Sequence, residues 1–385
     1  MILSENDPGY QRCSLSVLDN IADPAIRFDG AGISNYYHAY KKAEAVVPFL
    51  APDAEQQLDQ VVSKIKKAAG KDRFDSIMGV SGGVDSTYMA YQAKKLGLNP
   101  LVVHFDNGWN SELAVKNIEN IVSKLGFELF TLVVDWNEFK DIQLAYLKAS
   151  VVDIEAITDH AIIATLYKLA AEHGIRYILS GTNIVTEFVL PSYWIWNKYD
   201  SKNIKAIHQQ YGSVPLKTYP FLSMQQRHYY QRVKKIETVA ILNYMPYRKT
   251  EVKDTIIREL GWRDYGGKHY ESIFTRFYQG HILPQKFHID KRKAHLSNLV
   301  FSGQMSREEA LQELHTAPYA GEQFRTDFDF VLKKFNLTEA EWNSIMAQPR
   351  REHAAFDHDK RTVWEQYPYL KPLRGVWRRL SAVNG

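Results

Sequence analysis

The chain has 385 residues, a net charge of +4 from 48 basic and 44 acidic side chains, and 45% apolar residues. This length favours two or three compact units, and the composition is typical of a globular protein rather than a disordered one. A net charge this small does not by itself indicate a nucleic-acid binder. The single cysteine, Cys13, excludes an internal disulfide, a four-cysteine zinc site and sulfur transfer through two cysteines of the chain.

The sequence also lacks the usual signs of a membrane or secreted protein. No run of 18 or more apolar residues occurs, so we expect no membrane span. The first residues have neither the charged nor the apolar region of a secretory signal. We therefore expect the protein in the cytoplasm.

The order in which helix and strand patterns follow one another along the chain predicts an α/β fold. Residues 1–50 are rich in turns and are expected to form a small module, and apolar spacing over 53–69 predicts a helix that ends at Gly70. Short apolar runs then alternate with helical patterns and predict strands at 75–80, 100–105, 128–135 and 176–181. Such an alternation predicts a parallel sheet, of about five strands, covered on both faces.

A different pattern follows the predicted sheet. After about residue 240 the chain consists of helical segments rich in Arg, Lys, Tyr and His, of which 306–314 is the clearest. We therefore divide the chain into an N-terminal module (1–50), a sheet domain (51–240) and a mainly helical C-terminal region (241–385). The ligand site of a parallel sheet lies at the carboxyl ends of its strands, where we expect the helical region to complete it.

A glycine-rich loop, SGGVDS (81–86), carries the clearest chemical signal. It follows the strand at 75–80 and opens a helix, so its backbone N–H groups form a cradle for an anion. The hydroxyls of Ser81 and Ser86 can add hydrogen bonds. Asp85 would repel a bare phosphate and is therefore expected to hold Mg²⁺ against it. The alternative is a tight turn capped by Ser81 and Asp85.

This loop resembles the PP-loop of the ATP pyrophosphatases and matches neither the Walker A nor the dinucleotide-binding pattern. The resemblance implies a sheet of the adenine nucleotide alpha hydrolase-like type, with ATP and Mg²⁺ as cofactors. It also implies that ATP is cleaved between its α and β phosphates, that AMP is placed on a substrate oxygen, and that a nucleophile then displaces it.

Longer sequence blocks between residues 10 and 315 indicate a more specific family within the ATP pyrophosphatases. They are CSLSVLDNIADPAIRFDGAG, DNGWNSELAVKNIEN, LSGTNIVTEFVLP, NIKAIHQQYG, GWRDYGGKHYESIFTRFYQGHILPQKFHIDKRKAHLS and SGQMSREEAL. Together they resemble the N-acetyl sugar amidotransferases of the WbpG/PseA type. This resemblance implies that an acetamido group on a nucleotide-activated sugar, with a UDP-linked 2,3-diacetamido uronic acid as the expected substrate, becomes an acetamidino group. The products serve lipopolysaccharide O-antigen or nonulosonic acid biosynthesis.

The resemblance also implies where the ammonia comes from. In this family a glutaminase and cyclase pair resembling the two subunits of imidazole glycerol phosphate synthase supplies it. Cys13 lies in an irregular segment, away from the settings that activate a cysteine nucleophile, so we expect no glutamine hydrolysis within the chain.

The N-terminal module departs from the family pattern. Family members carry two C-x-x-C pairs, whereas the corresponding positions here read YQRC (10–13) and SNYY (34–37). Three of the four zinc ligands are missing, so no zinc is expected. We interpret Cys13 as a remnant, and expect packing by Tyr10, Tyr36 and Tyr37 to replace the metal.

Further candidates follow the strands. Asp106 comes after the second strand, where it could hold the ribose or Mg²⁺, although an Asx turn is an equal alternative. Gly181 and Thr182 end the fourth strand and resemble a second ATP-contacting loop, with a helix N-cap as the alternative. Glu187, one turn later, could bind metal or orient ammonia, or could be a solvated glutamate.

The block from 268 to 295 supplies the remaining polar candidates, with a solvated helix face as the alternative for its basic run. We predict the catalytic residues to be Asp85, Glu187, His269, Glu271 and Lys291. We predict the nucleotide-binding residues to be Ser81, Gly82, Gly83, Val84, Asp85, Ser86, Asp106, Gly181, Thr182, Lys286 and Arg292.

Two other functions are compatible with the loop. The first is a tRNA-modifying PP-loop enzyme, which the small net charge and the absence of a thiol pair disfavour. The second is a nucleotide-binding module without catalysis. We expect neither nucleic acid nor a membrane among the partners.

Overall fold

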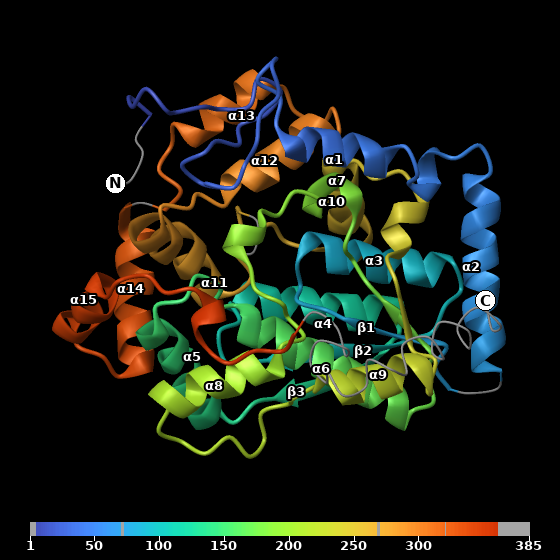
Figure 1. Cartoon of the computed structure of the whole chain (residues 1–385). Helices are drawn as coiled ribbons and strands as arrows, with labels where there is room; N and C mark the ends of the chain where they lie inside the picture. Colours follow the sequence, from blue (N-terminus) through green and yellow to red (C-terminus); the bar gives the residue numbers. More distant parts are fainter. Residues whose placement is uncertain (1–4, 71–72, 268–269, 320, 361–385) are drawn as a thin grey trace, which may run out of the picture.

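The computed structural model describes residues 5–70, 73–267, 270–319 and 321–360. A five-stranded sheet with the order β3-β2-β1-β4-β5 lies at its centre, and every neighbouring pair is parallel (Figure 1). This confirms the α/β prediction. The strands are β1 (Ser76–Gly79), β2 (Pro100–Asp106), β3 (Glu128–Val133), β4 (Tyr177–Leu179) and β5 (Glu237–Val239).

Helices make up most of the remaining described chain, and the described part of the C-terminal region is mainly helical, as predicted. A π-helix, Tyr278–Phe287, continues directly from α11. The α-helices are α1 (Asn35–Glu44), α2 (Ala54–Ala69), α3 (Val84–Lys95), α4 (Glu112–Leu125), α5 (Trp136–Ala149), α6 (Ala156–Glu172), α7 (Ile184–Glu187), α8 (Ser201–Tyr211), α9 (Met224–Arg232), α10 (Lys249–Leu260), α11 (Ile273–Phe277), α12 (Arg292–Phe301), α13 (Arg307–Leu314), α14 (Gly321–Phe335) and α15 (Glu339–Ala347). None of the described helices combines the length and the apolar character that crossing a bilayer requires.

The central strands β1, β2 and β4 consist almost entirely of buried residues because helices cover both faces of the sheet. Successive residues of a strand point to opposite faces. Ile77 of β1 accordingly packs with Ala164 and Tyr167 of α6, whereas Met78 belongs to the cluster that contains Met89 of α3. Helix α6 contacts β1 and β4 on one face of the sheet. Packing on both faces fixes the position of β1 and therefore of the loop that follows it.

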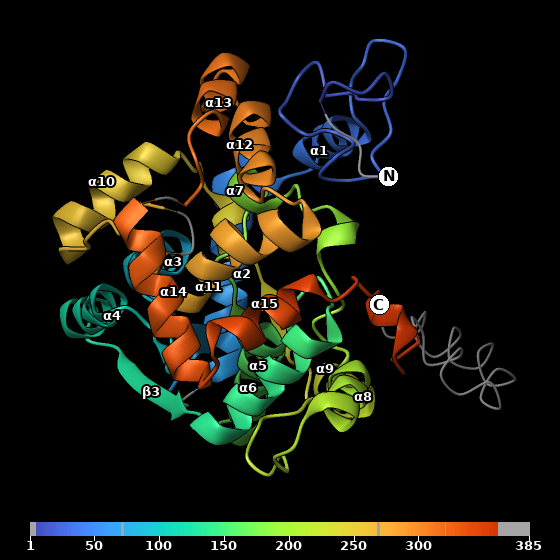
Figure 2. The same cartoon turned by 90° about the vertical axis from the view of Figure 1, so that its left-hand side faces the viewer.

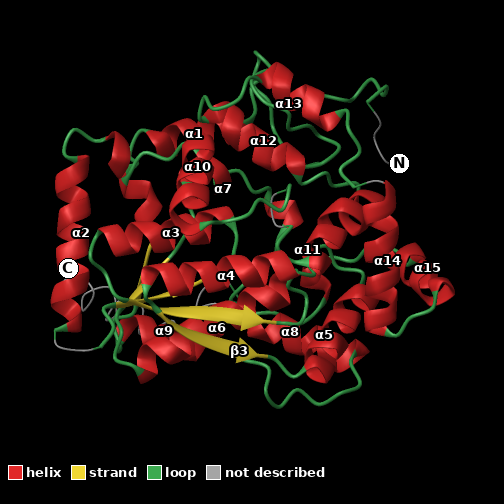
Figure 3. Cartoon of the chain, turned by 180° about the vertical axis from the view of Figure 1, so that it is seen from behind, coloured by secondary structure: helices red, strands yellow, loops and turns green. Residues whose placement is uncertain are grey.

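The edges of the sheet differ from the prediction. Strand β3, expected to be buried, lies at the edge of the sheet (Figure 3). It exposes most of its residues, including 68% of Val133. Strand β5 is absent from the sequence-based prediction because it has three residues, two of them exposed. Helix α1 is a further element that the turn-rich composition of residues 1–50 does not reveal.

The N-terminal module packs on the C-terminal region (Figure 2). The backbone N–H of Val17 donates to the Ser297 hydroxyl of α12 at 3.3 Å, and Val17 forms a small core with Leu296 and Ala310. Arg307 donates from its guanidinium to the Cys13 and Ser16 carbonyls. The N-terminal module is therefore packed against α12 and α13.

Hydrogen bonds organise the inside of this module. Cys13 is buried and its Sγ accepts from the Ser34 N–H at 3.3 Å, and Tyr36 donates to Asp23 at 2.6 Å. Tyr37 packs edge-on against Phe301 of α12. Among the described residues no group of three or more His, Cys, Asp or Glu side chains is arranged to hold a metal ion.

We predict that Lys293→Ala destabilises the protein by about 3 kcal/mol, because it removes the close cation from a buried carboxylate, which keeps only the Arg12 guanidinium at 3.9 Å. Lys293 of α12 pairs with Asp19 of the N-terminal module, whose side chain is fully buried. Urea unfolding would measure the change. Lys41→Ala is the control, since Lys41 pairs with Glu44 at the surface and should cost less than about 1 kcal/mol. Equal losses in the two variants would contradict the buried-pair account.

Candidate active site

The loop after β1 is built as an anion cradle. Helix α3 begins at Val84, so the loop lies at its N-terminus, where backbone N–H groups point outward. The Ser81 hydroxyl accepts from the Gly83 N–H at 3.2 Å, and the Ser86 hydroxyl donates to the Gly83 carbonyl at 3.2 Å. The two hydroxyls lie 3.4 Å apart, on the same side of the loop. They would flank an anion bound at the helix end.

Gly82 is required by both its conformation and its surroundings. Its φ of +79° lies in the left-handed region, which favours glycine. A Cβ atom there would lie 2.7 Å from the backbone oxygen of Ala114 in α4. Its carbonyl accepts from the Trp262 indole N–H at 2.8 Å. The loop is therefore fastened between the sheet domain and the C-terminal region.

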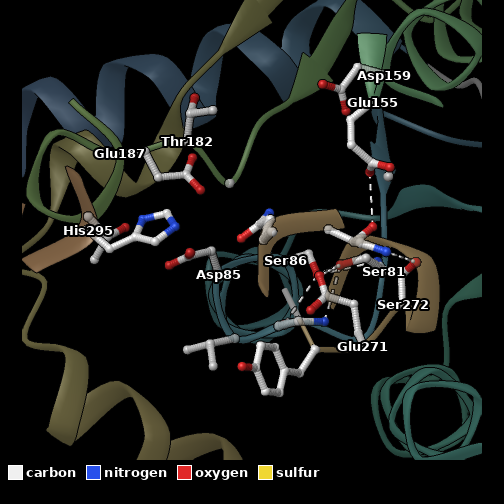
Figure 4. Close-up of a pocket in the computed structure, with 18 of the residues that line it drawn as sticks. Ser81, Asp85, Ser86, Glu155, Asp159, Thr182, Glu187, Glu271, Ser272 and His295 are labelled. Carbon is white, nitrogen blue, oxygen red and sulfur yellow. Dashed lines mark hydrogen bonds between the residues drawn. The ribbon is translucent and has the colours of Figure 1, made fainter. Parts of the chain in front are cut away.

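Two neutral donors from distant segments reach Asp85. The Tyr247 hydroxyl donates to its Oδ1, and the Asn183 amide approaches the same oxygen at 3.4 Å. Burial, followed by the charge of Asp85, raises the pKa of Tyr247 far above its ordinary value, so the hydroxyl remains a donor. Figure 4 shows the side chains of Asp85, Glu187 and His295 turned toward a common space. Two carboxylates thus face one region beside the anion cradle.

Glu271 reaches the loop because its backbone pairs with the segment after β2. The Ser111 N–H donates to the Glu271 carbonyl, and the Ile273 N–H donates to the Trp109 carbonyl, both at 2.9 Å. The side chain of Glu271 then accepts from the Ser81 hydroxyl at 3.4 Å. Residues 190 positions apart therefore meet at the anion cradle.

A cavity of about 1050 Å³ extends from the loop over the carboxyl ends of the strands. Its wall combines residues of the sheet domain with residues of the C-terminal region. The predicted residues that line it are Ser81, Gly83, Val84, Asp85, Ser86, Gly181, Thr182, Glu187, Glu271, Lys291 and Arg292. Gly82 is buried beneath this surface. His269 lies outside the described residues.

Two predicted nucleotide contacts need correction. Asp106 forms the alternative Asx turn, since its Oδ1 accepts from the Gly108 N–H at 2.9 Å and from Asn110, and it is not part of the cavity wall. Lys286 lies away from the cavity and donates to the carbonyls of Ile345 and Gln348 at the end of α15. Its charge there caps a helix C-terminus, a common use of lysine.

Arg292 lies in the cavity wall but is already engaged. Its guanidinium pairs with Asp290 at 2.7 Å and donates to the Thr316 carbonyl at 2.9 Å. Asn183 serves as the N-cap of α7, which was the alternative for this loop, and also approaches Asp85. Arg292 and Asn183 thus each have a structural role and also lie beside the cavity.

Several cavity residues carry no signal in the sequence. Tyr247 lies between β5 and α10 without a motif around it, and only the fold brings it to Asp85. Glu155 and Asp159 at the start of α6 also line the cavity. An apolar helix pattern surrounds both residues, and no motif in the sequence marks them as part of a site.

Two models of known protein families match two separate stretches of the chain, and both stretches contribute residues to this cavity. The family model "LPS biosynthesis protein WbpG-like, C-terminal domain" matches residues 271–371, and the model "Queuosine biosynthesis protein QueC" matches residues 75–169. The second match covers the glycine loop and the first begins at Glu271. These matches confirm the resemblance to WbpG-type PP-loop proteins.

Individual relatives share shorter stretches. GMP synthase [glutamine-hydrolyzing] from Thermus thermophilus is 33% identical over 134 residues, which is 33% of this chain and 25% of that protein. tRNA(Ile)-lysidine synthase from Chlamydia pneumoniae is 34% identical over 71 residues, which is 17% of this chain and 22% of that protein. The chain thus spans about a quarter of the length of these curated relatives. Among solved structures, NMN synthetase from Francisella tularensis matches with a TM-score of 0.33 and 11% identity over 74% of this chain and 96% of that chain.

We predict that Gly82→Ala lowers the free energy of unfolding by at least about 2 kcal/mol, because a side chain in the left-handed region is strained and its Cβ would collide with Ala114. Chemical denaturation would measure the loss. Gly30→Ala is the matched control, since no atom lies within 4 Å of its Cβ position. A Gly82→Ala protein as stable as Gly30→Ala would show that the loop is not confined as described.

Proposed function

We propose that this PP-loop protein of the WbpG type converts an acetamido group of a nucleotide-activated sugar into an acetamidino group at the expense of ATP. The expected substrate is a UDP-linked 2,3-diacetamido uronic acid destined for lipopolysaccharide O-antigen, and the products include AMP and pyrophosphate. The observation that carries the proposal is the meeting of Ser81 and Glu271. Through it, the PP-loop and the WbpG-like segment form one cavity.

The loop side of the cavity would bind ATP. Helix α3 begins at Val84, directly after its N-cap Gly83, and its N-terminus lies between the hydroxyls of Ser81 and Ser86. Asp85 and Glu187 offer hard oxygen ligands on one side of this cradle, a donor set that suits Mg²⁺. We infer that these two carboxylates would hold the ion. Magnesium would neutralise the charge of the departing pyrophosphate.

The chemistry has to turn an amide oxygen into a leaving group. The acetamido oxygen attacks the α-phosphorus of ATP, and pyrophosphate departs with the electrons of the broken P–O bond. Ammonia then attacks the resulting imidate carbon, and the C–O bond breaks to release AMP. The chain must align both reactions and exclude water, which would otherwise hydrolyse the adenylated sugar.

The WbpG-like segment would bind the sugar nucleotide. Tyr270, Glu271 and Lys291 line the cavity opposite the sheet, together with Arg292. A buried lysine offers a cation to the diphosphate or the carboxylate of the sugar. We propose that Glu271 and Lys291 act in catalysis there, and His269 keeps its predicted role.

We propose that ammonia arrives from a separate glutaminase and cyclase pair resembling imidazole glycerol phosphate synthase. Cys13, the single cysteine, is buried in the N-terminal module and does not line the cavity. The reaction would take place in the cytoplasm, where ATP and sugar nucleotides are made.

The test incubates the protein with ATP, Mg²⁺, ammonium and a panel of UDP- and CMP-linked diacetamido sugars. We expect sugar-dependent AMP and a product about 1 Da lighter, because an oxygen atom is replaced by an NH group. Glutamine alone should not replace ammonium. AMP formation that responds to bulk tRNA instead of a sugar would favour a tRNA-modifying enzyme, and ATP binding without AMP under any condition would favour a nucleotide-binding module.

We predict that Asp85→Asn lowers AMP formation by at least about 100-fold, the usual cost of losing one preorganised electrostatic contact. Asparagine keeps an oxygen for Tyr247, so the melting temperature should change little. Chromatography of the released AMP would measure the loss of activity. Glu251→Gln, at an exposed position of α10, is the control and should retain full activity. An active Asp85→Asn protein would contradict the magnesium role.

A further inference from the structure

A second group of ionisable side chains lines the same cavity, apart from the residues assigned to ATP. Glu155 and Asp159 come from the start of α6, and Lys291 precedes α12. Asp153 and Lys198 lie next to them. In the view of Figure 4, Glu155 and Asp159 lie across the cavity from Asp85 and Glu187. The cavity therefore has two separate sets of carboxylates.

The contacts within this group single out Glu155. The Lys198 ammonium pairs with Asp153 at 2.6 Å and with Asp159 at 3.1 Å, so these two carboxylates share one cation. Glu155 accepts instead from the hydroxyl of Thr275 at 2.9 Å. Thr275 belongs to α11, in the segment that matches the WbpG-like family model. The WbpG-like segment thus orients a carboxylate of the sheet domain.

The charges around Glu155 favour proton exchange near neutral pH. Burial, and after it the Asp159 carboxylate, raise the pKa of Glu155 to about 7, against the opposing effects of Thr275, Lys291 and Lys198. Burial, and after it the charge of Lys198, lower the pKa of Lys291. A raised pKa makes the Glu155 carboxylate a stronger base than an ordinary glutamate.

The proposed reaction requires one such base. The acetamido nitrogen and ammonia bring four N–H hydrogens, and the amidinium product keeps three. One proton must therefore leave the ammonia nitrogen before or as the C–O bond breaks and AMP departs with the bonding electrons. Without a base, the attacking nitrogen stays positively charged and is expelled again in preference to AMP.

We propose that Glu155 is the catalytic base that removes this proton from the ammonia nitrogen. The inference rests on the proposed function and adds a residue to it. The carboxylates near ATP are less suited, because Asp85 is held by Tyr247 and assigned with Glu187 to magnesium, and Glu271 lies against Ser81. Asp290 is paired with Arg292. Glu155 lines the cavity, where it would face the sugar's acetamido carbon.

Titration of the protein alone is the first test. Glutamate labelled with ¹³C at the carboxyl carbon would be followed by NMR from pH 4 to 9, and Glu155→Gln would identify the signal of Glu155. Glutamine retains an oxygen that can accept from Thr275, so the fold should persist, which circular dichroism would check. We expect this signal to titrate with a midpoint near 7. A midpoint near the ordinary value of glutamate would overturn the proposal.

Kinetics separate the two half-reactions. Sugar-dependent exchange of labelled pyrophosphate into ATP, measured without ammonia with the UDP-linked 2,3-diacetamido uronic acid, reports adenylation alone. We expect Glu155→Gln to keep this exchange within about threefold and to lose amidine formation by at least about 100-fold, the usual contribution of general base catalysis. The ratio of wild-type to variant rates should rise as the pH passes 7 and then level off. A parallel loss of both half-reactions would indicate a structural role and contradict the proposal.

A change of nucleophile completes the test. Hydroxylamine is a weaker base than ammonia and loses its proton more readily, so it should restore much of the activity of Glu155→Gln. Glu155→Asp should be intermediate, and Glu172→Gln, at an exposed position of the same helix, should behave as wild type. Wild-type protein without pyrophosphate exchange for any sugar would refute the proposed function itself. Normal exchange and normal amidine formation in Glu155→Gln would refute only the role of Glu155.

Discussion

The backbone pairing between residues 109–111 and 271–273 decides what faces the glycine loop. Two hydrogen bonds of 2.9 Å join the segment after β2 to the start of the WbpG-like region, and the Trp262 indole fastens the same region to Gly82. Peptide bonds are rigid, so these few contacts determine the position of Glu271 and, through α11, of Thr275. The site is consequently a property of the assembled chain and not of the sheet domain alone.

Charge is distributed unevenly over the cavity. One side carries Asp85 and Glu187 beside a helix N-terminus, where backbone dipoles and a cation can balance the negative charge. The other side carries Glu155 and Asp159, with Asp153 next to them, and the two lysines Lys198 and Lys291 offset these three carboxylates incompletely. Similar side chains therefore acquire different proton affinities within one cavity. Such separation lets a single pocket combine phosphate chemistry with proton transfer.

Local features were predictable from the sequence, and features set by tertiary contacts were not. The loop at 81–86 was recognised because strand, turn and helix follow one another within a few residues. Asp106 and Lys286 were assigned to the nucleotide because the sequence shows a charge but not the direction in which it points. Tyr247 and Glu155 were overlooked for the opposite reason, since no local pattern marks a residue that distant segments bring to the cavity. Strand β5 and helix α1 were missed because short, half-exposed elements have little periodicity.

The contact between Ser81 and Glu271 has a consequence for how the protein is made. At the usual elongation rate of about 5–20 residues per second, synthesis of the 190 intervening residues takes roughly 10–40 s. During that time the sheet domain can emerge from the ribosome, yet the surface that receives Trp262 and Glu271 stays uncovered. A folding intermediate with an exposed apolar face attracts chaperones or other nascent chains. Expression at low temperature, or together with chaperones, should therefore favour the assembled form.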